Sequence, residues 1–136
     1  MSKAPSGNLG ARLLLAWAIP GAGHFLMGRR RVGGLLFFAI TATFLFGLIS
    51  SEGRAVSVRK HPYAFAAQVG AGLLTVVPAG YRLTLDLRPE TVRPPDSDIP
   101  LYARLDLGLL FTMVAGLLNL VLVHNVYERS TRPASG

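Results

Sequence analysis

The stretch VGGLLFFAITATFLFGLI, from Val32 to Ile49, contains no charged residue. As a helix it would be about 27 Å long, close to the roughly 30 Å thickness of the hydrocarbon core of a membrane. Each unpaired backbone polar group in lipid costs several kcal/mol, so only helices and closed barrels span membranes. Because the stretch lacks the alternating pattern of barrel strands, it predicts a transmembrane helix.

The composition of the whole chain also indicates a membrane protein. Of its 136 residues, 51% are hydrophobic and 15% are charged, whereas a soluble domain has about 25% charged residues. The mean hydropathy is +0.43, and the formal net charge is +7. The chain has no cysteine, which excludes disulfides, thiolate metal sites and a cysteine nucleophile.

Two further apolar segments lie towards the C-terminus. Residues 105–124 begin LDLGLLFTMVAGLLNLVLV, and the charge of this segment, Asp106, lies near its start. Residues 63–81 begin and end with tyrosine, a residue type enriched at the membrane interface. Alanines, glycines and Pro78 lower the propensity of this segment to insert. It predicts a third span, with a re-entrant or interfacial helix as the alternative.

The N-terminal segment, residues 11–27, is interrupted by Pro20-Gly21. A proline next to a glycine should kink a helix. A cleaved signal peptide is the competing interpretation, which we reject because Pro20 gives a poor cleavage context. Four segments therefore predict one all-α membrane domain over residues 1–136, a small bundle of four transmembrane helices at about residues 11–27, 32–49, 63–81 and 105–124.

The charges around these spans give a weak signal for orientation. With four spans, the basic residues divide seven and seven between the two sides, so the positive-inside rule gives a tie. Arg29, Arg30 and Arg31 share one very short loop and form the group that is hardest to translocate. We therefore expect a multi-pass protein of the bacterial inner membrane, with this loop in the cytoplasm and both termini outside.

The same three arginines are candidates for contact with lipid. Anionic head groups attract surface arginines by about 1 kcal/mol per residue, and the alternative role is to anchor the topology by snorkelling. We do not expect nucleic-acid binding, because Arg29–Arg31 lie close to the bilayer and have no aromatic residues interleaved.

Small residues at four-residue spacing predict how the helices pack. Lipid is as apolar as leucine, so helices associate through close packing of small residues and through polar side chains. Gln68 and Asn119 are the polar side chains deep in their spans, and we expect hydrogen bonds between helices from them. The alternative for a small-residue stripe is that it docks a partner subunit. The expected packing residues are Gly21, Gly23, Ala39, Thr43, Gly47, Ala67, Ala71, Gly108, Thr112, Gly116 and Asn119.

The three histidines raise a haem-binding hypothesis, since imidazole is a common axial ligand. With four spans, His24 and His124 lie near opposite faces of the membrane, roughly 30 Å apart. His61 precedes Pro62 in a loop and is poorly placed for rigid ligation. We therefore expect no cofactor, haem included, and no metal site.

The longest polar segment, residues 82–104, contains four prolines, four basic residues and four acidic residues. It predicts an irregular loop outside the membrane, and it is the segment that we expect to contact a partner protein. Nothing in it resembles a nucleophile–base pair, a cluster of metal ligands or a phosphate-binding glycine loop. We expect no catalytic residue.

Two stretches resemble known families. LAWAIPGAGHFLMGRRRVGGLLFF, from Leu15 to Phe38, resembles the hairpin of the TM-two domain, in which an apolar helix runs into a P-G-x-G-H-F turn. VAGLLNLVLVHNVYE, from Val114 to Glu128, is similar to the last span of a bacterial membrane family, domain of unknown function 6677. That family has an aspartate–tyrosine pair where this chain has Asn125 and Tyr127. The resemblance implies a multi-span bacterial membrane protein without assigned catalytic residues.

These observations predict a non-enzymatic accessory or scaffolding subunit of a larger bacterial membrane complex. One alternative is a small oligomeric transporter or channel, in which Asn119, Gln68 and threonines line a path. Against it, no carboxylate lies deep in a span and no paired inverted repeat is evident. The second alternative is a b-haem-binding electron-transfer subunit.

Overall fold

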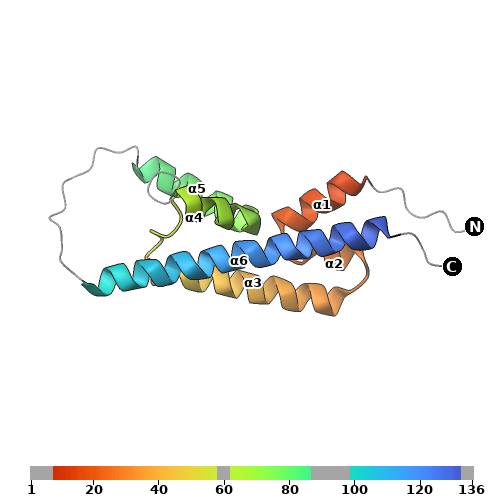
Figure 1. Ribbon diagram of the computed structural model, residues 1–136, viewed down its shortest axis with the longest axis horizontal. Coiled ribbons are helices and arrows are strands. Elements are labelled where there is room, and N and C mark those ends of the chain that lie inside the picture. Colours follow the sequence, from red (N-terminus) through yellow and green to blue (C-terminus); the bar gives the residue numbers. More distant parts are fainter. Residues whose placement is uncertain (1–7, 58–61, 87–98, 133–136) are drawn as a thin grey trace, which may run out of the picture.

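The computed structural model describes residues 8–57, 62–86 and 99–132, and every regular element within these ranges is a helix. Two helices are long and apolar enough to cross a membrane, namely α3 (Arg30–Ser50) and α6 (Ile99–Thr131). They lie side by side in opposite directions, and the other helices pack around them (Figure 1). The shorter elements are α1 (Leu9–Ala18), α2 (Ala22–Leu26), α4 (Pro62–Gln68), the 3-10 helix η1 (Val69–Ala71) and α5 (Leu73–Asp86).

Glycines set the close approach of α3 and α6. A Cβ atom added to Gly47 of α3 would lie 2.8 Å from the carbonyl oxygen of Gly108 of α6, and one added to Gly108 would lie 2.6 Å from the carbonyl oxygen of Gly47. Small residues allow helix backbones to come into direct contact, which strengthens dispersion interactions where no hydrophobic effect operates. Gly47 and Gly108 therefore form the contact point of the two long helices.

The first hairpin consists of α1 and α2, and the chain reverses direction at Ile19–Gly21. Pro20 has no N–H to continue α1, and Gly21 adopts a positive φ of 79°. After the turn, Gly23 of α2 packs against Ala16 of α1, so the two helices lie against each other. The chain thus returns to the end of the bundle from which it came (Figure 1).

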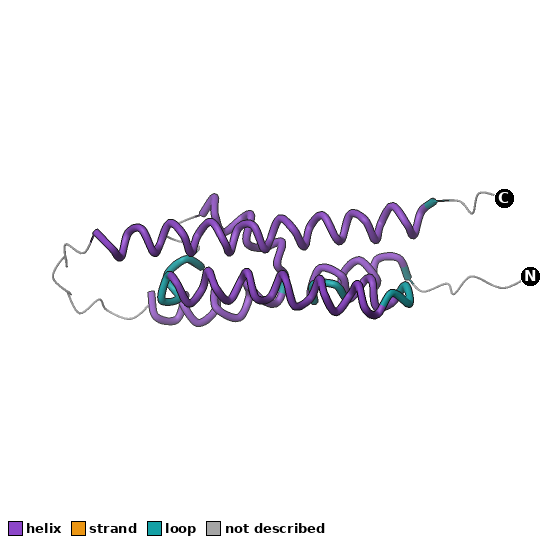
Figure 2. Tube along the Cα trace, turned by 90° about the horizontal axis from the view of Figure 1, so that it is seen from below, coloured by secondary structure: helices purple, strands orange, loops and turns teal. Residues whose placement is uncertain are grey.

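The second hairpin consists of α4, η1 and α5, and it enters from the opposite end of the bundle (Figures 1 and 2). The chain reverses at Gly72, which has φ 63° and ψ −129°. Across the turn, the Thr75 hydroxyl donates a hydrogen bond to the carbonyl oxygen of Gln68. Each hairpin is followed by one long helix, so the chain consists of two hairpin-plus-helix units in opposite orientation.

The tips of the two hairpins share a short sequence. Both contain Gly-Ala-Gly, at residues 21–23 and 70–72, with an alanine three residues before the first glycine. The turns fall at different positions of this match, because the glycine with positive φ is Gly21 in the first tip and Gly72 in the second. The helices that follow the two turns also differ in length, since α2 has 5 residues and α5 has 14.

The expectation of four spanning helices is not confirmed. Residues 11–27 are divided between α1 and α2, and residues 63–81 are divided at Gly72. A membrane span needs about 20 helical residues, and none of these pieces is that long. Pro20-Gly21 reverses the chain where we expected a kink, and the re-entrant alternative for 63–81 agrees with the hairpin observed.

The polar segment at residues 82–104 is shorter than expected at both ends. Helix α5 continues to Asp86, and α6 begins at Ile99. The expected contact loop is thereby reduced to residues 87–98, which lie outside the described residues.

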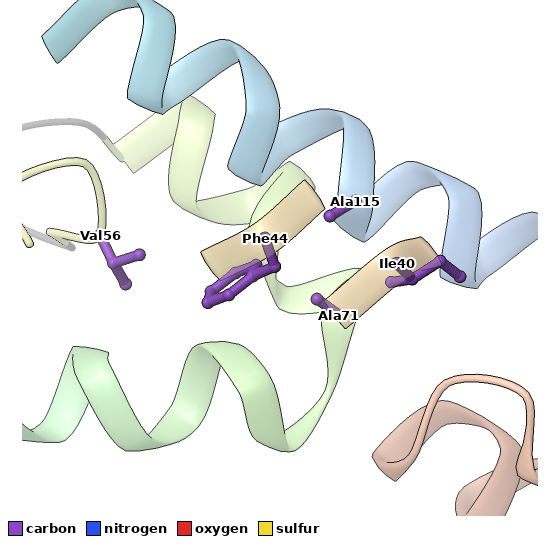
Figure 3. Close-up of a cluster of buried hydrophobic side chains, with 5 residues drawn as sticks. All are labelled: Ile40, Phe44, Val56, Ala71 and Ala115. Carbon is purple, nitrogen blue, oxygen red and sulfur yellow. The ribbon is translucent and has the colours of Figure 1, made fainter. Parts of the chain in front are cut away.

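The centre of the bundle is apolar and small. Ile40 and Phe44 of α3 pack with Val56, Ala71 of η1 and Ala115 of α6 (Figure 3). The outer faces are apolar as well. In α3, for example, Leu35, Phe38 and Ile49 are 71%, 73% and 74% exposed. Outward-facing side chains of this kind are expected where lipid, and not water, surrounds a helix.

Candidate functional site

The two hairpin tips meet beside the middle of α6. The Trp17 Nε1–H donates to the carbonyl oxygen of Val69 at 3.0 Å, which links the end of α1 to η1. A Cβ atom at Gly72 would collide with the carbonyl oxygen of Trp17 and would lie 2.9 Å from the Cα of Ala18. The two tips are therefore in backbone contact, which we call the tip junction.

Asn119 of α6 fastens the tip junction. Its side-chain Nδ2 donates to the carbonyl oxygen of Trp17 at 2.9 Å and to that of Gly70 at 2.8 Å. The last carbonyls of a helix have no partner within the helix, and an unpaired carbonyl in an apolar environment costs several kcal/mol. One amide thus satisfies a carbonyl from each hairpin. Gly70 in turn has no Cβ, which leaves room for the backbone of Gly116, one turn before Asn119.

A second polar cluster joins α4 to α6 and to the segment after α3. Gln68 Nε2 donates to the carbonyl oxygen of Ala55 at 3.1 Å and to the Thr112 hydroxyl at 2.8 Å. The Thr112 hydroxyl lies 2.8 Å from the carbonyl oxygen of Gly108, to which it donates. The Ser51 hydroxyl accepts from the Ala55 N–H at 3.2 Å. These hydrogen bonds connect α4, α6 and the segment after α3 within the buried interior.

The buried polar side chains of these two sites hold separate segments of the chain together by hydrogen bonds. Asn119, Gln68 and Thr112 are fully buried, and their donors are directed at backbone or side-chain oxygens. Asn119 Oδ1 and Gln68 Oε1 have no hydrogen-bond partner among the described residues. No group of three or more His, Asp or Glu side chains that could hold a metal ion occurs in the described ranges.

Asn119→Leu should destabilise the folded protein by about 1–3 kcal/mol, because it leaves two buried carbonyls without a donor. The matched control is Asn125→Leu, since Asn125 only accepts a hydrogen bond from Arg129 at the exposed end of α6. That variant should change stability by less than about 0.5 kcal/mol. Thermal unfolding in detergent measures both, and equal midpoints for the two variants would contradict the fastening role of Asn119.

The residues expected to pack fall into two groups. Most are buried between helices, and Ala67 is half-buried with its carbonyl oxygen against Gly116. Ala39 is exposed, and the Thr43 hydroxyl donates to the Ala39 carbonyl of its own helix. The buried residues of α3 are Gly33, Ile40, Phe44 and Gly47, so the inward face passes beside the predicted stripe. The buried group comprises Gly21, Gly23, Gly47, Ala71, Gly108, Thr112, Gly116 and Asn119.

The structure corrects the predicted separation of two histidines. Because the first hairpin turns back, His24 lies at the same end of the bundle as His124. Gly23, next to His24, packs against Val126 of α6. Residues two apart on a helix point in roughly opposite directions, so His124 faces away from α2 and lies 3.6 Å from Glu128. His24 is buried and His124 is exposed. His61 lies outside the described residues.

The hairpins also redistribute the charges. We call the end of the bundle at which α3 begins and α6 ends the basic end. Among the described residues it carries six arginines and one acidic residue, Glu128. The opposite end carries three arginines and three acidic residues in the same described ranges. The arginines of the basic end are Arg12, Arg29, Arg30, Arg31, Arg129 and Arg132. The starts of α1 and α3 therefore lie together, whereas four spans would have separated them.

Comparison with known proteins identifies the family of the chain but gives no information about its activity. No curated protein and no solved structure matches the chain. The model of a family of unknown function, DUF6677, matches residues 11–135. This confirms the resemblance seen in the last span and extends it over both hairpins and both long helices. The chain therefore belongs to the DUF6677 family.

Proposed function

We propose that this protein is a non-enzymatic integral protein of the bacterial inner membrane and serves as an accessory or scaffolding subunit of a larger complex. In this arrangement α3 and α6 cross the membrane, and the two hairpins enter from opposite sides and meet near its centre. The observation that carries the proposal is the use of the buried amides. Asn119 and Gln68 direct their N–H groups at oxygens of the chain itself and hold the bundle closed.

The outer faces of the long helices support a role in assembly. Large apolar side chains project outward along both helices, among them Phe38 of α3 and Val121 of α6. Two spans with two short hairpins have a small interior relative to this outer surface. A partner with its own transmembrane helices can therefore pack on the surface without disturbing the fastened core.

The basic end supports an orientation. Arg29 ends a tight turn, and Arg30 and Arg31 are the first two residues of α3. Basic residues near short loops remain in the cytoplasm. We therefore place the basic end in the cytoplasm. The start of α1 and the end of α6 then also lie on the cytoplasmic side, in contrast to the outside termini expected with four spans.

Purification from the native membrane in mild detergent tests the subunit role. We expect a companion protein to co-purify in a fixed ratio with a chain tagged at its C-terminus. Because Val121 and Phe38 lie on the outer faces, Phe38→Ala or Val121→Ala should weaken that association if either face forms the contact. Ala39→Ser, a small change on the same exposed side of α3, serves as the matched control. Recovery of the tagged chain alone as a monomer would contradict the proposal.

The second candidate function is a small oligomeric transporter or channel, and the inverted hairpins favour it. Broken helices that meet at mid-membrane in two inverted units are typical of secondary transporters. This candidate predicts a homo-oligomer and solute flux in proteoliposomes that Asn119→Leu abolishes. Isolation of a heteromeric complex that shows no solute flux would support the subunit role and contradict the transporter role.

A further inference from the structure

We propose that the basic end of the bundle binds the phosphate head groups of anionic lipids, at a site formed by Arg29, Arg30 and Arg31 beside the start of α3. The proposal rests on the membrane-spanning arrangement proposed above. It commits to lipid, and not to free phosphate or nucleic acid, as the source of the phosphate group.

The three arginines present their guanidinium groups outward. Each residue is exposed, and none of the three guanidinium groups has a hydrogen bond or ion pair with a residue in the described ranges. Together with Gly28 and Val32 they line an open hollow of about 400 Å³. A guanidinium offers a planar set of donors that matches two phosphate oxygens at once. The hollow is therefore lined by donors that fit a phosphate and are not used within the chain.

The backbone adds to this positive charge. Helix α3 begins at Arg30 without a side-chain cap and without an acidic residue in its first turn. The first N–H groups of a helix have no partner within the helix, and they carry a partial positive charge. In α3 these groups lie at the same place as the guanidinium groups, so both attract an anion.

Among the described residues, no carboxylate forms an ion pair with Arg29, Arg30 or Arg31. The backbone N–H of Arg29 donates to the carbonyl oxygen of His24, which fixes the turn between α2 and α3. Glu128 is the acidic residue described at this end, and it lies 3.6 Å from His124 on the outer side of α6. The described residues of the basic end thus carry an excess of positive charge, which attracts anions.

Apolar side chains next to the arginines indicate which phosphate compound fits. Phe25 and Leu26 are exposed a few residues before the arginines, Val32 is exposed directly after them, and Leu35 is exposed one turn later. A lipid places its phosphate at the guanidinium groups and its acyl chains along these apolar side chains. Free phosphate and nucleic acid would leave the apolar side chains uncovered. This combination favours a lipid.

Native mass spectrometry of the full chain in mild detergent tests the proposal. The protein is mixed with phosphatidylglycerol or with zwitterionic phosphatidylcholine, and retained lipid is counted. We expect preferential retention of phosphatidylglycerol. Replacing Arg29, Arg30 and Arg31 by Gln should weaken that retention by about fivefold for each arginine removed. The matched control, with Arg54→Gln and Arg104→Gln at the opposite end, should retain phosphatidylglycerol as the unaltered chain does.

Three outcomes would overturn the proposal. The first is equal retention of both lipids. The second is unchanged retention in the triple variant. The third is displacement of phosphatidylglycerol by inorganic phosphate or RNA at equal concentration, which would identify a phosphate or nucleic-acid site instead.

A salt titration of the unaltered chain keeps the test valid if the triple variant does not fold. The Debye length falls from about 10 Å at 0.1 M salt to about 3 Å at 1 M. Retention of phosphatidylglycerol must therefore decrease as the salt concentration rises over this range. Retention that does not change with salt would also overturn the lipid site. Extraction at alkaline pH separates this failure from failure of the proposed function. A chain that resists extraction but shows no lipid preference remains an integral membrane protein without a lipid site.

Discussion

Cysteines introduced in place of Tyr63 and Leu83 should react with a membrane-impermeant maleimide from the same side of the membrane. The two positions lie at the outer ends of the second hairpin, and their side chains are 91% and 46% exposed. A straight helix through residues 63–81 would place them on opposite sides. The experiment needs no background substitutions, because the chain has no cysteine of its own.

Two further pairs complete this labelling experiment. Ala11→Cys and Leu26→Cys, at the outer ends of the first hairpin, should also share a side, and it should be the side opposite to Tyr63. Arg31→Cys lies in the first turn of α3 and Arg54→Cys lies just after its end. These two positions should react from opposite sides, which shows that the assay distinguishes the two faces. Reaction of the Tyr63 and Leu83 positions from opposite sides would contradict the hairpin and restore a third span.

Gly72→Ala should destabilise the protein by at least about 3 kcal/mol, because two separate costs combine at this position. The positive φ of 63° is unfavourable for any residue with a Cβ. In addition, the Cβ would collide with the carbonyl oxygen of Trp17 at the tip junction. The atoms nearest to this Cβ all belong to the backbone of Trp17 and Ala18, so no flexible side chain could move aside to make room.

Two other glycines separate these costs. Gly28 has a φ of 77° but open space around it, so Gly28→Ala should cost only about 1–2 kcal/mol. Gly80 lies within α5 in open space, and Gly80→Ala should stabilise by about 0.5–1 kcal/mol. Thermal unfolding measures all three, and Trp17, the one tryptophan of the chain, reports on the junction by its fluorescence. A Gly72→Ala variant as stable as Gly28→Ala would show that the tips do not touch.

The two long helices could be predicted from the sequence because length and composition alone define them. The hairpins could not be predicted in the same way. Pro20-Gly21 is compatible with a kink and with a reversal, and the difference depends on partners far along the chain. Trp17 bonds to Val69, 52 residues away, and Asn119 bonds to Trp17, 102 residues away. A local pattern carries no information about such contacts.

Gly-Ala-Gly occurs at the tips of both hairpins, and it is the similarity that the sequence offers between them. This match does not align the two turns, because the chain reverses at Gly21 in the first tip and at Gly72 in the second. The small-residue stripes gave a different kind of error. Spacing of four places Ala39, Thr43 and Gly47 on one stripe, yet α3 turns only Gly47 towards α6. Which face of an apolar helix is buried depends on its neighbours, since nearly every face is apolar.

The position of Asn119 has a consequence for the order in which the molecule is completed. Ribosomes deliver the first hairpin early, but the donor for the Trp17 carbonyl lies 102 residues later and arrives with the last helix. Until then, the tip of a nascent chain retains an unsatisfied carbonyl that must stay hydrated or be shielded by the insertion machinery. In the proposed membrane arrangement, insertion of α6 is therefore also the event that locks the N-terminal hairpin in place.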